Sequence, residues 1–252
     1  MIDKLCYQSK LRYLNATQKF IYALLTLFIC VGSRSCVIAV IVFAINGFLT
    51  VYKGGVLFTR YLRYLSVPLA FLVLSTFTIA VNFSSTPLDL FAILVKDFYI
   101  TCSKQSLLLV VQLIFTAMAS VSCLYFLSFS TPMTDILLVL KKFYCPALII
   151  ELMLLIYRYI FILMEISTNI YLSQKSRLCD KDYKTSFKSF VSLVSVLFIR
   201  AIKKSNYLFD AMDSRCYDGV INVLNENYPA KKKDTVLISI FLLLLIIIWI
   251  GW

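Results

Sequence analysis

The chain has no histidine among its 252 residues. Histidine is the commonest transition-metal ligand and the commonest general base, so its absence removes the usual means of building either site. The sequence also has no GxxxxGK[ST] phosphate loop, no HExxH and, despite eight cysteines, no CxxC pair. We therefore expect no ATP bound by such a loop and neither metal nor cofactor bound by this chain, and nothing in these patterns positively supports an enzyme.

Acidic residues are few: 13 Asp and Glu stand against 25 Lys and Arg, which gives a net charge of +12. Hydrophobic residues make up 61% of the chain, and its mean hydropathy is +0.86. A soluble domain has only about 45–50% apolar residues, so the excess must face the lipid bilayer. In a membrane protein Lys and Arg collect in cytoplasmic segments. We interpret the charge as a record of topology and expect no nucleic-acid partner.

Long apolar stretches predict the membrane-spanning helices, since a span needs roughly 20 residues. The stretch at 20–49 is interrupted by Gly-Ser-Arg-Ser, and we interpret it as two short helices joined at Arg34. Further spans are predicted at about 66–83, 107–129 and 235–250, with a less regular stretch at 84–103. The prediction is an all-α membrane protein with about five transmembrane helices.

The basic residues set the predicted orientation. With a cytoplasmic N-terminus, the outer segments hold only Arg34, Lys96 and Lys104, and all other basic groups lie inside. We predict a multi-pass protein of the cell membrane in three parts. These are N-terminal membrane helices at 1–130, cytoplasmic helices at 131–230 and a C-terminal transmembrane helix at 231–252.

The predicted cytoplasmic part contains three helices. Thr131 and Pro132 read as an N-cap and first helical residue of a short amphipathic helix closed by Pro146. A second helix runs from Ala147 to about Ser176. A third, at 185–213, has an apolar stripe with polar residues off it, so it should pack on a partner helix or lie at the membrane surface.

The second predicted helix carries an ionic stripe of Glu151, Arg158 and Glu165, spaced by nearly two turns. Charged groups in an apolar helix face protein or each other rather than lipid. We interpret the arginine as paired with the two glutamates inside the helix. A transport or proton-relay role is the alternative.

The second and third helices end alike. One ends in Ser176, Arg177 and Leu178, and the other in Ser214, Arg215 and Cys216. Gly219 can supply the left-handed conformation that terminates the third helix. Each arginine can complement its helix dipole or bind a partner, and the residues alone leave both roles open.

These motifs resemble a known family. SRCYDG at 214–219, after Ala211-Met212, is similar to the second signature of the transmembrane (T) component of energy-coupling factor (ECF) transporters, and most closely to the cobalt-type CbiQ branch. Further similar segments occur in the order that the family shows. They are IDKLCYQSKL…QKF at 2–20, TP at 131–132, CP at 145–146, LLIYRYIFILME at 154–165 and SR at 176–177.

The resemblance implies that the two long helices are coupling helices of an ABC importer. In the family each ends in a small-Arg-small motif that docks into one of two cytoplasmic ABC ATPase subunits, and the residues in those places here are Ser176, Arg177, Leu178, Ser214, Arg215 and Cys216. Leu178 and Cys179 stand where the family commonly has small residues. The chain would be a non-catalytic lever acting on a membrane S component, which binds the substrate: cobalt or another transition-metal ion.

Other functions stay open at this point. A T component serving vitamin-binding S components is one alternative. A membrane-bound lipid- or isoprenoid-processing enzyme is another; it would need carboxylates to hold Mg²⁺ on a diphosphate, and Asp210, Asp213 and Asp218 are the candidate cluster. A stand-alone secondary transporter needs an internal repeat, which the spans do not show.

Overall fold

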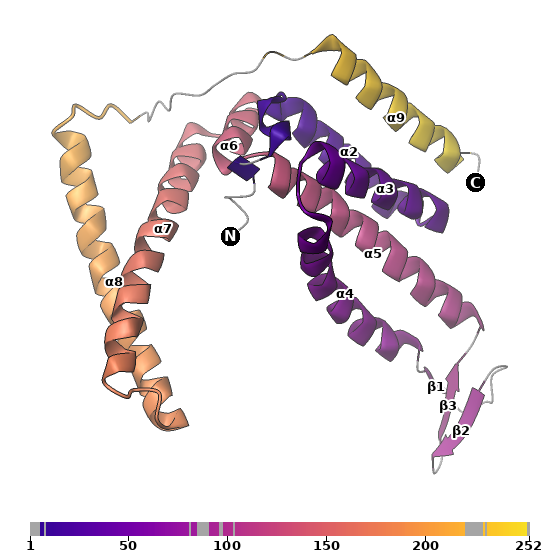
Figure 1. Ribbon diagram of the computed structural model, residues 1–252, viewed down its shortest axis with the longest axis horizontal. Helices are drawn as coiled ribbons and strands as arrows, with labels where there is room; N and C mark the ends of the chain where they lie inside the picture. The colour runs from indigo at the N-terminus through magenta and orange to yellow at the C-terminus, as the bar shows by residue number, and fades with distance from the viewer. Residues whose placement is uncertain are drawn as a thin grey trace. The chain divides into compact units, whose positions relative to one another are not determined.

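The computed structural model describes residues 6, 7, 9–80, 82–84, 91–95, 98–102, 104–219, 229 and 231–250. Contacts divide the chain into two compact units (Figure 1). The first, here called the bundle, comprises Met1–Ile136 and Glu226–Trp252. The second, the hairpin unit, comprises Leu137–Asn225. The predicted boundary before the C-terminal helix, at residue 230, lies outside the described residues, as do residues 2–5 and 8 of the N-terminal segment.

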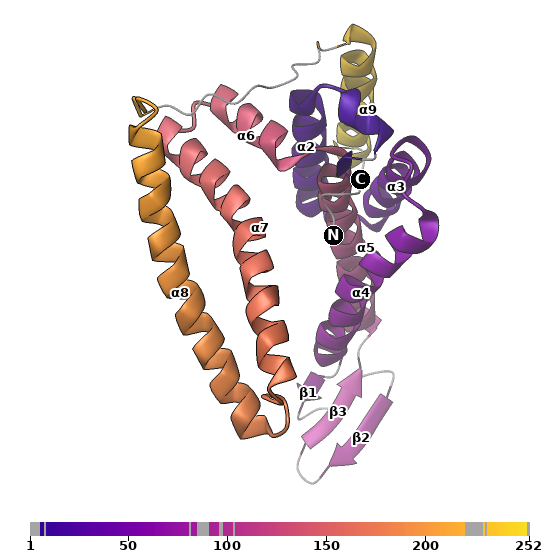
Figure 2. The same cartoon turned by 60° about the vertical axis from the view of Figure 1, so that its left-hand side comes forward.

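The bundle consists of helices arranged around α5. This helix contacts α2, α3 and α4, while α9 packs against α2 and α3 (Figures 1 and 2). Buried side chains of α2, α3, α5 and α9 form one core cluster. The bounds are η1 Lys10–Tyr13, α2 Ala16–Ser33, α3 Cys36–Phe48, the π-helical turn η2 Leu49–Lys53, α4 Phe58–Ala80, α5 Lys104–Ser130 and α9 Lys232–Ile250.

The junction of α2 and α3 is Arg34, which has a left-handed backbone with φ 45°. This conformation ends α2 after Ser33, and α3 begins at Cys36. The predicted division of residues 20–49 into two helices joined at Arg34 is confirmed.

A small antiparallel sheet follows α4, where the sequence predicts only a less regular stretch. Its strands are β1 Asn82–Ser84, β2 Phe91–Val95 and β3 Phe98–Cys102, with β3 between the other two. Ile100 pairs with Phe83 on one side and Ile93 on the other. The aromatic and β-branched residues of β2 and β3 are the signal for strands that the sequence offered.

The hairpin unit contains α7 Ala147–Ser176 and α8 Tyr183–Asp213, which lie antiparallel to one another (Figure 2). The bounds of α7 are those predicted, and α8 begins two residues earlier than its prediction. The short helix α6, Met133–Lys142, starts after Pro132 and ends before Pro146. Pro146 is the N-cap of α7 rather than the residue that closes α6.

Six helices within the described residues are long and apolar enough to cross a membrane, so this is a multi-pass membrane protein of the predicted all-α class, to which the small sheet after α4 is an addition. Four match predicted spans: α2, α3 with η2, α5 and α9. Helix α4 is not among the six, but the predicted span at about 66–83 extends beyond the described residues of this helix, so that span stays a prediction. Helices α7 and α8 are among the six, so length and composition allow one span more than the predicted five. Their cytoplasmic location stays a prediction.

A buried network of polar side chains joins α2, α3 and α5. The Tyr22 hydroxyl donates to Asn46 Oδ1 at 2.9 Å, and Asn46 Nδ2 donates to Cys123 Sγ at 3.1 Å. The Thr26 hydroxyl donates to the same sulfur at 3.6 Å. All four side chains are buried. Lipid offers no hydrogen-bond partners, so these groups satisfy one another and fix how the three helices meet.

Lys19 is a buried cation at the start of α2, with 4% of its surface exposed. Its Nζ donates to the backbone oxygen of Ser130 at 2.7 Å and to that of Leu11 at 3.0 Å. A buried ammonium group is costly unless it is hydrogen-bonded, so these two carbonyls hold it in place. Lys19 thereby joins η1, α2 and the end of α5.

Asn46→Ala should lower the free energy of unfolding by about 0.6–1.7 kcal/mol, because the Tyr22 hydroxyl loses its buried acceptor. The measurement is unfolding of the purified chain in detergent. Ser33→Ala is the matched control, since among the described residues that hydroxyl bonds only to the Cys30 carbonyl of its own helix. If the effects of Asn46→Ala and Tyr22→Phe add in full in the double variant, the two side chains are not coupled.

Candidate docking site

The end of α7 is a Schellman turn. The N–H of Leu178 donates to the carbonyl of Lys175 at 3.0 Å, and the N–H of Cys179 donates to that of Gln174 at 3.3 Å. Leu178 has φ 58°, the left-handed conformation that this turn requires. Arg177 is the capping residue between the helix and the left-handed residue.

The end of α8 repeats this arrangement. The N–H of Cys216 donates to the carbonyl of Asp213 at 2.9 Å, and the N–H of Tyr217 donates to that of Met212 at 3.1 Å. Cys216 has φ 56°. Arg215 therefore occupies the same position in its turn as Arg177 does at the end of α7.

The end of α6 is also a Schellman turn, so this turn by itself does not identify a candidate docking site. Tyr144 has φ 60°, its N–H donates to the Lys141 carbonyl at 3.3 Å, and that of Cys145 donates to the Leu140 carbonyl at 3.2 Å. No arginine stands in this turn. The ends of α7 and α8 differ from it by their Ser-Arg pairs.

The two serines behave alike. The Ser176 hydroxyl donates to the carbonyl of Ser173 at 2.9 Å, and the Ser214 hydroxyl donates to that of Ala211 at 3.1 Å. Each serine hydroxyl is therefore turned back onto its own helix. A small side chain in this orientation leaves the neighbouring arginine as the group that projects from the helix end.

The two arginines are exposed, as are the four residues beside them, and 75% of Leu178 is accessible. Within the part of the chain that the structure describes, neither guanidinium forms an ion pair or a side-chain hydrogen bond. Both are permanently charged donors. The two motifs lie at opposite ends of the hairpin (Figure 1). The helix between them, α8, has 31 residues, so a rise of 1.5 Å per residue separates the motifs by about 45 Å.

Gly219 does not mark the end of α8. It has φ 90°, but the left-handed residue that closes the Schellman turn is Cys216, three positions earlier. The helix is therefore terminated by Cys216, and Gly219 bends the chain beyond it. Glycine is the usual residue at such a cap, which is why the sequence points to Gly219.

The ionic stripe is exposed except at one position. Arg158 and Glu165 are accessible, whereas only 8% of Glu151 is exposed. The Tyr217 hydroxyl, two residues after Arg215, donates to Glu151 Oε2 at 2.8 Å. This hydrogen bond is the largest cause that raises the pKa of Tyr217 above its ordinary value. Pairing of Arg158 with the glutamates stays a prediction.

Two further hydrogen bonds join α7 to α8. Gln174 Nε2 donates to the carbonyl of Ser189 at 3.1 Å, and the Tyr159 hydroxyl donates to that of Lys204 at 3.5 Å. Most side chains of both helices are exposed, and Glu151 and Leu193 are their buried residues. These hydrogen bonds therefore add to a small apolar contact between α7 and α8.

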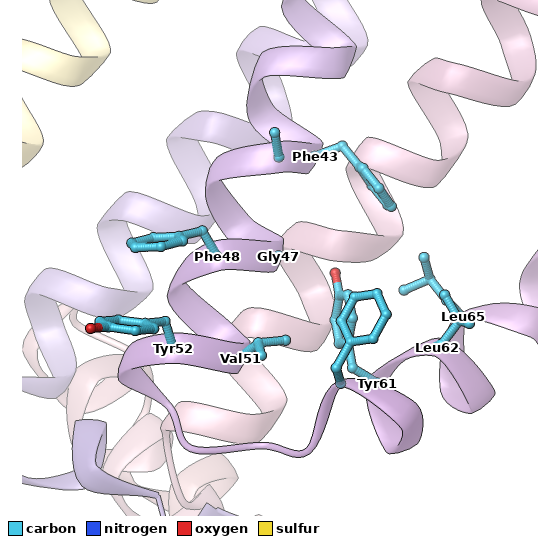
Figure 3. A pocket seen from close by; sticks show the side chains of 10 residues that line it. Phe43, Gly47, Phe48, Val51, Tyr52, Tyr61, Leu62 and Leu65 are labelled. Atoms are coloured by element: carbon cyan, nitrogen blue, oxygen red, sulfur yellow. The ribbon is translucent and has the colours of Figure 1, made fainter.

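A pocket of about 420 Å³ lies in the bundle between α3, η2 and the start of α4 (Figure 3). The rings of Phe48 and Tyr52 stack at its edge with centroids 5.1 Å apart, and the Tyr61 hydroxyl is 2.8 Å from that of Ser122. No carboxylate, thiol or basic group lines it. This pocket suits apolar groups and offers no acid, base or metal ligand.

Metal-binding residues do not gather elsewhere in the described part of the chain. No group of three or more His, Cys, Asp or Glu side chains there is placed to hold a metal ion. Asp210, Asp213 and Asp218 are all described, and they form no such group. The carboxylate cluster that a diphosphate-processing enzyme would need is therefore not assembled by these three residues.

Comparison with known proteins identifies relatives along nearly the whole chain. The family model described as cobalt transport protein, CbiQ, matches residues 8–226. An uncharacterised protein of Methanocaldococcus jannaschii is 35% identical over 248 residues, which cover 98% of this chain and 92% of that protein. A protein of Methanocorpusculum labreanum, named as a fused cobalt transport protein CbiMQ, is 30% identical over 97% of this chain and 41% of its own length. The cobalt transport protein CbiQ of Salmonella typhimurium is 23% identical over 86% of this chain and 97% of its own.

Leu178→Gly should raise the free energy of unfolding by about 0.5–1 kcal/mol. Relief of a left-handed backbone gains about 1–2 kcal/mol, and the greater freedom of glycine in the unfolded chain offsets about half of this. Leu178→Ala is the control, because alanine keeps the Cβ that causes the strain. Unfolding in detergent measures both variants. Equal stability of the glycine and alanine variants would show that the residue is not left-handed.

Proposed function

Because this chain belongs to the CbiQ cobalt transport protein family, we propose that it is the coupling subunit, or T component, of an ECF-type ABC importer. As a member it is a membrane component of cobalt transport and not an enzyme. The finer role is supported by one observation above the others. Two exposed arginines without partners in the described structure stand in equivalent turns at the ends of two long helices.

Each arginine would dock into a groove on one cytoplasmic ABC ATPase subunit. A guanidinium offers five donors in a rigid fork, and it can bind carboxylates or backbone carbonyls in such a groove. The serine beside each arginine adds no bulk, because its hydroxyl bonds back to the helix. The separation of about 45 Å along the 31-residue α8 favours two separate ATPase subunits over one.

The long helices would carry the motion of the ATPases to the membrane. Helix α7 has 30 residues and α8 has 31, and they are joined by hydrogen bonds along their length. Because α8 fixes the distance between the two docked ends, closing of the ATPases on ATP would change the tilt of the helix pair as a whole. This change would move a substrate-binding S component in the bilayer. ATP hydrolysis would occur in the partners, and cobalt would be bound by the S component.

This function requires the docking motifs to face the cytoplasm. The positive-inside distribution supports a cytoplasmic N-terminus and a cytoplasmic location for both motifs in the cell membrane. In that orientation the basic residues between Lys141 and Lys233 lie on the same side as the ATPases. The apolar surface of α7 and α8 then suits contact with the membrane surface and the S component.

The arginine variants test the proposal directly. In the tagged chain purified from its native host in mild detergent, Arg177→Glu with Arg215→Glu should weaken ATPase association about 30-fold or more, since reversed charge at an interface hot spot costs at least about 2 kcal/mol. The measurement is the amount of ATPase that copurifies. The wild-type chain should bring two ATPase subunits and a small membrane protein.

Arg200→Glu is the matched control. It makes the same charge change at an exposed arginine of α8 that is not at a helix end, so it should retain the ATPases. Normal copurification with the double variant, or equal loss with the control, would contradict docking by the two motifs.

A further inference from the structure

The buried Glu151 near the start of α7 needs a hydrogen-bond partner, since a carboxylate withdrawn from water is otherwise costly. The Tyr217 hydroxyl donates to it at 2.8 Å. A hydrogen bond to an ionised carboxylate is stronger than one between neutral groups. The two residues are 66 positions apart in the chain, and most of α7 and all of α8 lie between them.

Tyr217 has a second contact that links this bond to the docking motif. Its backbone N–H closes the Schellman turn on the Met212 carbonyl at 3.1 Å. Arg215 lies inside that turn, one residue before the left-handed Cys216. The backbone that carries the arginine is therefore held between its own helix and Glu151 of α7.

The first docking motif has a different attachment. The residue equivalent to Tyr217 is Cys179, and the link to the other helix comes from Gln174, which donates to the neutral Ser189 carbonyl. The nearby Tyr171 hydroxyl donates to Asp180 of its own segment, at 3.4 Å and in an exposed position. Within the described residues, a hydrogen bond to a buried carboxylate of the other helix accompanies the second motif and not the first.

We infer that Tyr217 and Glu151 form a latch that positions the second docking motif against the start of α7. With the latch formed, α7 and α8 are joined at both ends, by the turn at 177–182 and by the tyrosine–glutamate bond. A displacement at Arg215 is then shared by both helices. With the latch broken, the end of α8 that carries Arg215 can move relative to the start of α7. Tyr217 is thus a positioning residue, and this consequence rests on the proposed coupling function.

Hydrogen–deuterium exchange of the full purified chain tests the latch without any partner. Tyr217→Phe removes only the hydroxyl, and it should speed exchange about tenfold in two peptides at once, one covering 210–219 and one covering 147–155. Tyr171→Phe is the control at the first motif and should change neither peptide. Unchanged exchange in Tyr217→Phe, or faster exchange in the 210–219 peptide alone, would overturn the latch.

A second variant controls for loss of stability, because Tyr217→Phe leaves the buried Glu151 carboxylate with fewer hydrogen-bond partners. Tyr217→Phe with Glu151→Leu removes both polar groups and should unfold near the wild-type temperature, while both peptides still exchange faster. If exchange of both peptides returns to the wild-type rate, the hydrogen bond is not what holds them.

The functional consequence is measured in the native complex. The double latch variant should retain its ATPase subunits, yet its cobalt-ion uptake should fall about tenfold, as expected for the loss of a charge-assisted hydrogen bond. Uptake at the wild-type rate would overturn the positioning role. Arg215→Glu, assayed beside it, should lose the ATPases. If Arg215→Glu keeps them, docking fails while the exchange result still decides the latch.

Discussion

Backbone carbonyls at the end of a helix lack partners within the helix, and the way they are satisfied here places both arginines. At α7 and at α8 a left-handed residue turns the chain so that two following N–H groups reach back to the last carbonyls. Arg177 and Arg215 precede those residues and so stand at equivalent positions of the two turns. Neither left-handed residue is glycine, so each turn stores strain of about 1–2 kcal/mol. The equivalent placement of the two arginines thus follows from a local hydrogen-bonding requirement.

The parts of the fold that are set by residues close together in the sequence were predictable. The break at Arg34 and the bounds of α7 follow from local turn and capping chemistry, and the structure confirms them. The membrane class follows from composition and was also predictable. The strands after α4 were missed because the long apolar helices dominate the pattern around them. Hydropathy also admits α7 and α8 as candidate spans, since a long amphipathic helix with aromatic residues scores as apolar whichever surface it meets.

Some residues of the candidate site were likewise predictable from the sequence, and others were not. The Ser-Arg pairs were visible in the sequence because each is a short, contiguous motif that resembles a family signature. The residue that ends α8 was not, because preference for glycine points to Gly219, whereas the Tyr217 N–H closes the turn around Cys216. Glu151 could be recognised as a charge in an apolar helix, but its partner could not. Pairing of side chains 66 positions apart depends on how two helices pack, which no local pattern contains.

The buried Lys19 has a consequence for the biogenesis of the protein. Its acceptor carbonyl on Ser130 is synthesised 111 residues later, so this contact is absent when α2 first enters the bilayer. Until α5 arrives, only the Leu11 carbonyl of its two acceptors has been made, and we expect water or lipid headgroups at the membrane surface to supply the missing partner, with the alkyl chain along the helix. Lys19 therefore has one role during insertion and another in the folded protein. It first holds one end of α2 at the interface during insertion, and it then withdraws from water to bind the end of a helix that did not yet exist.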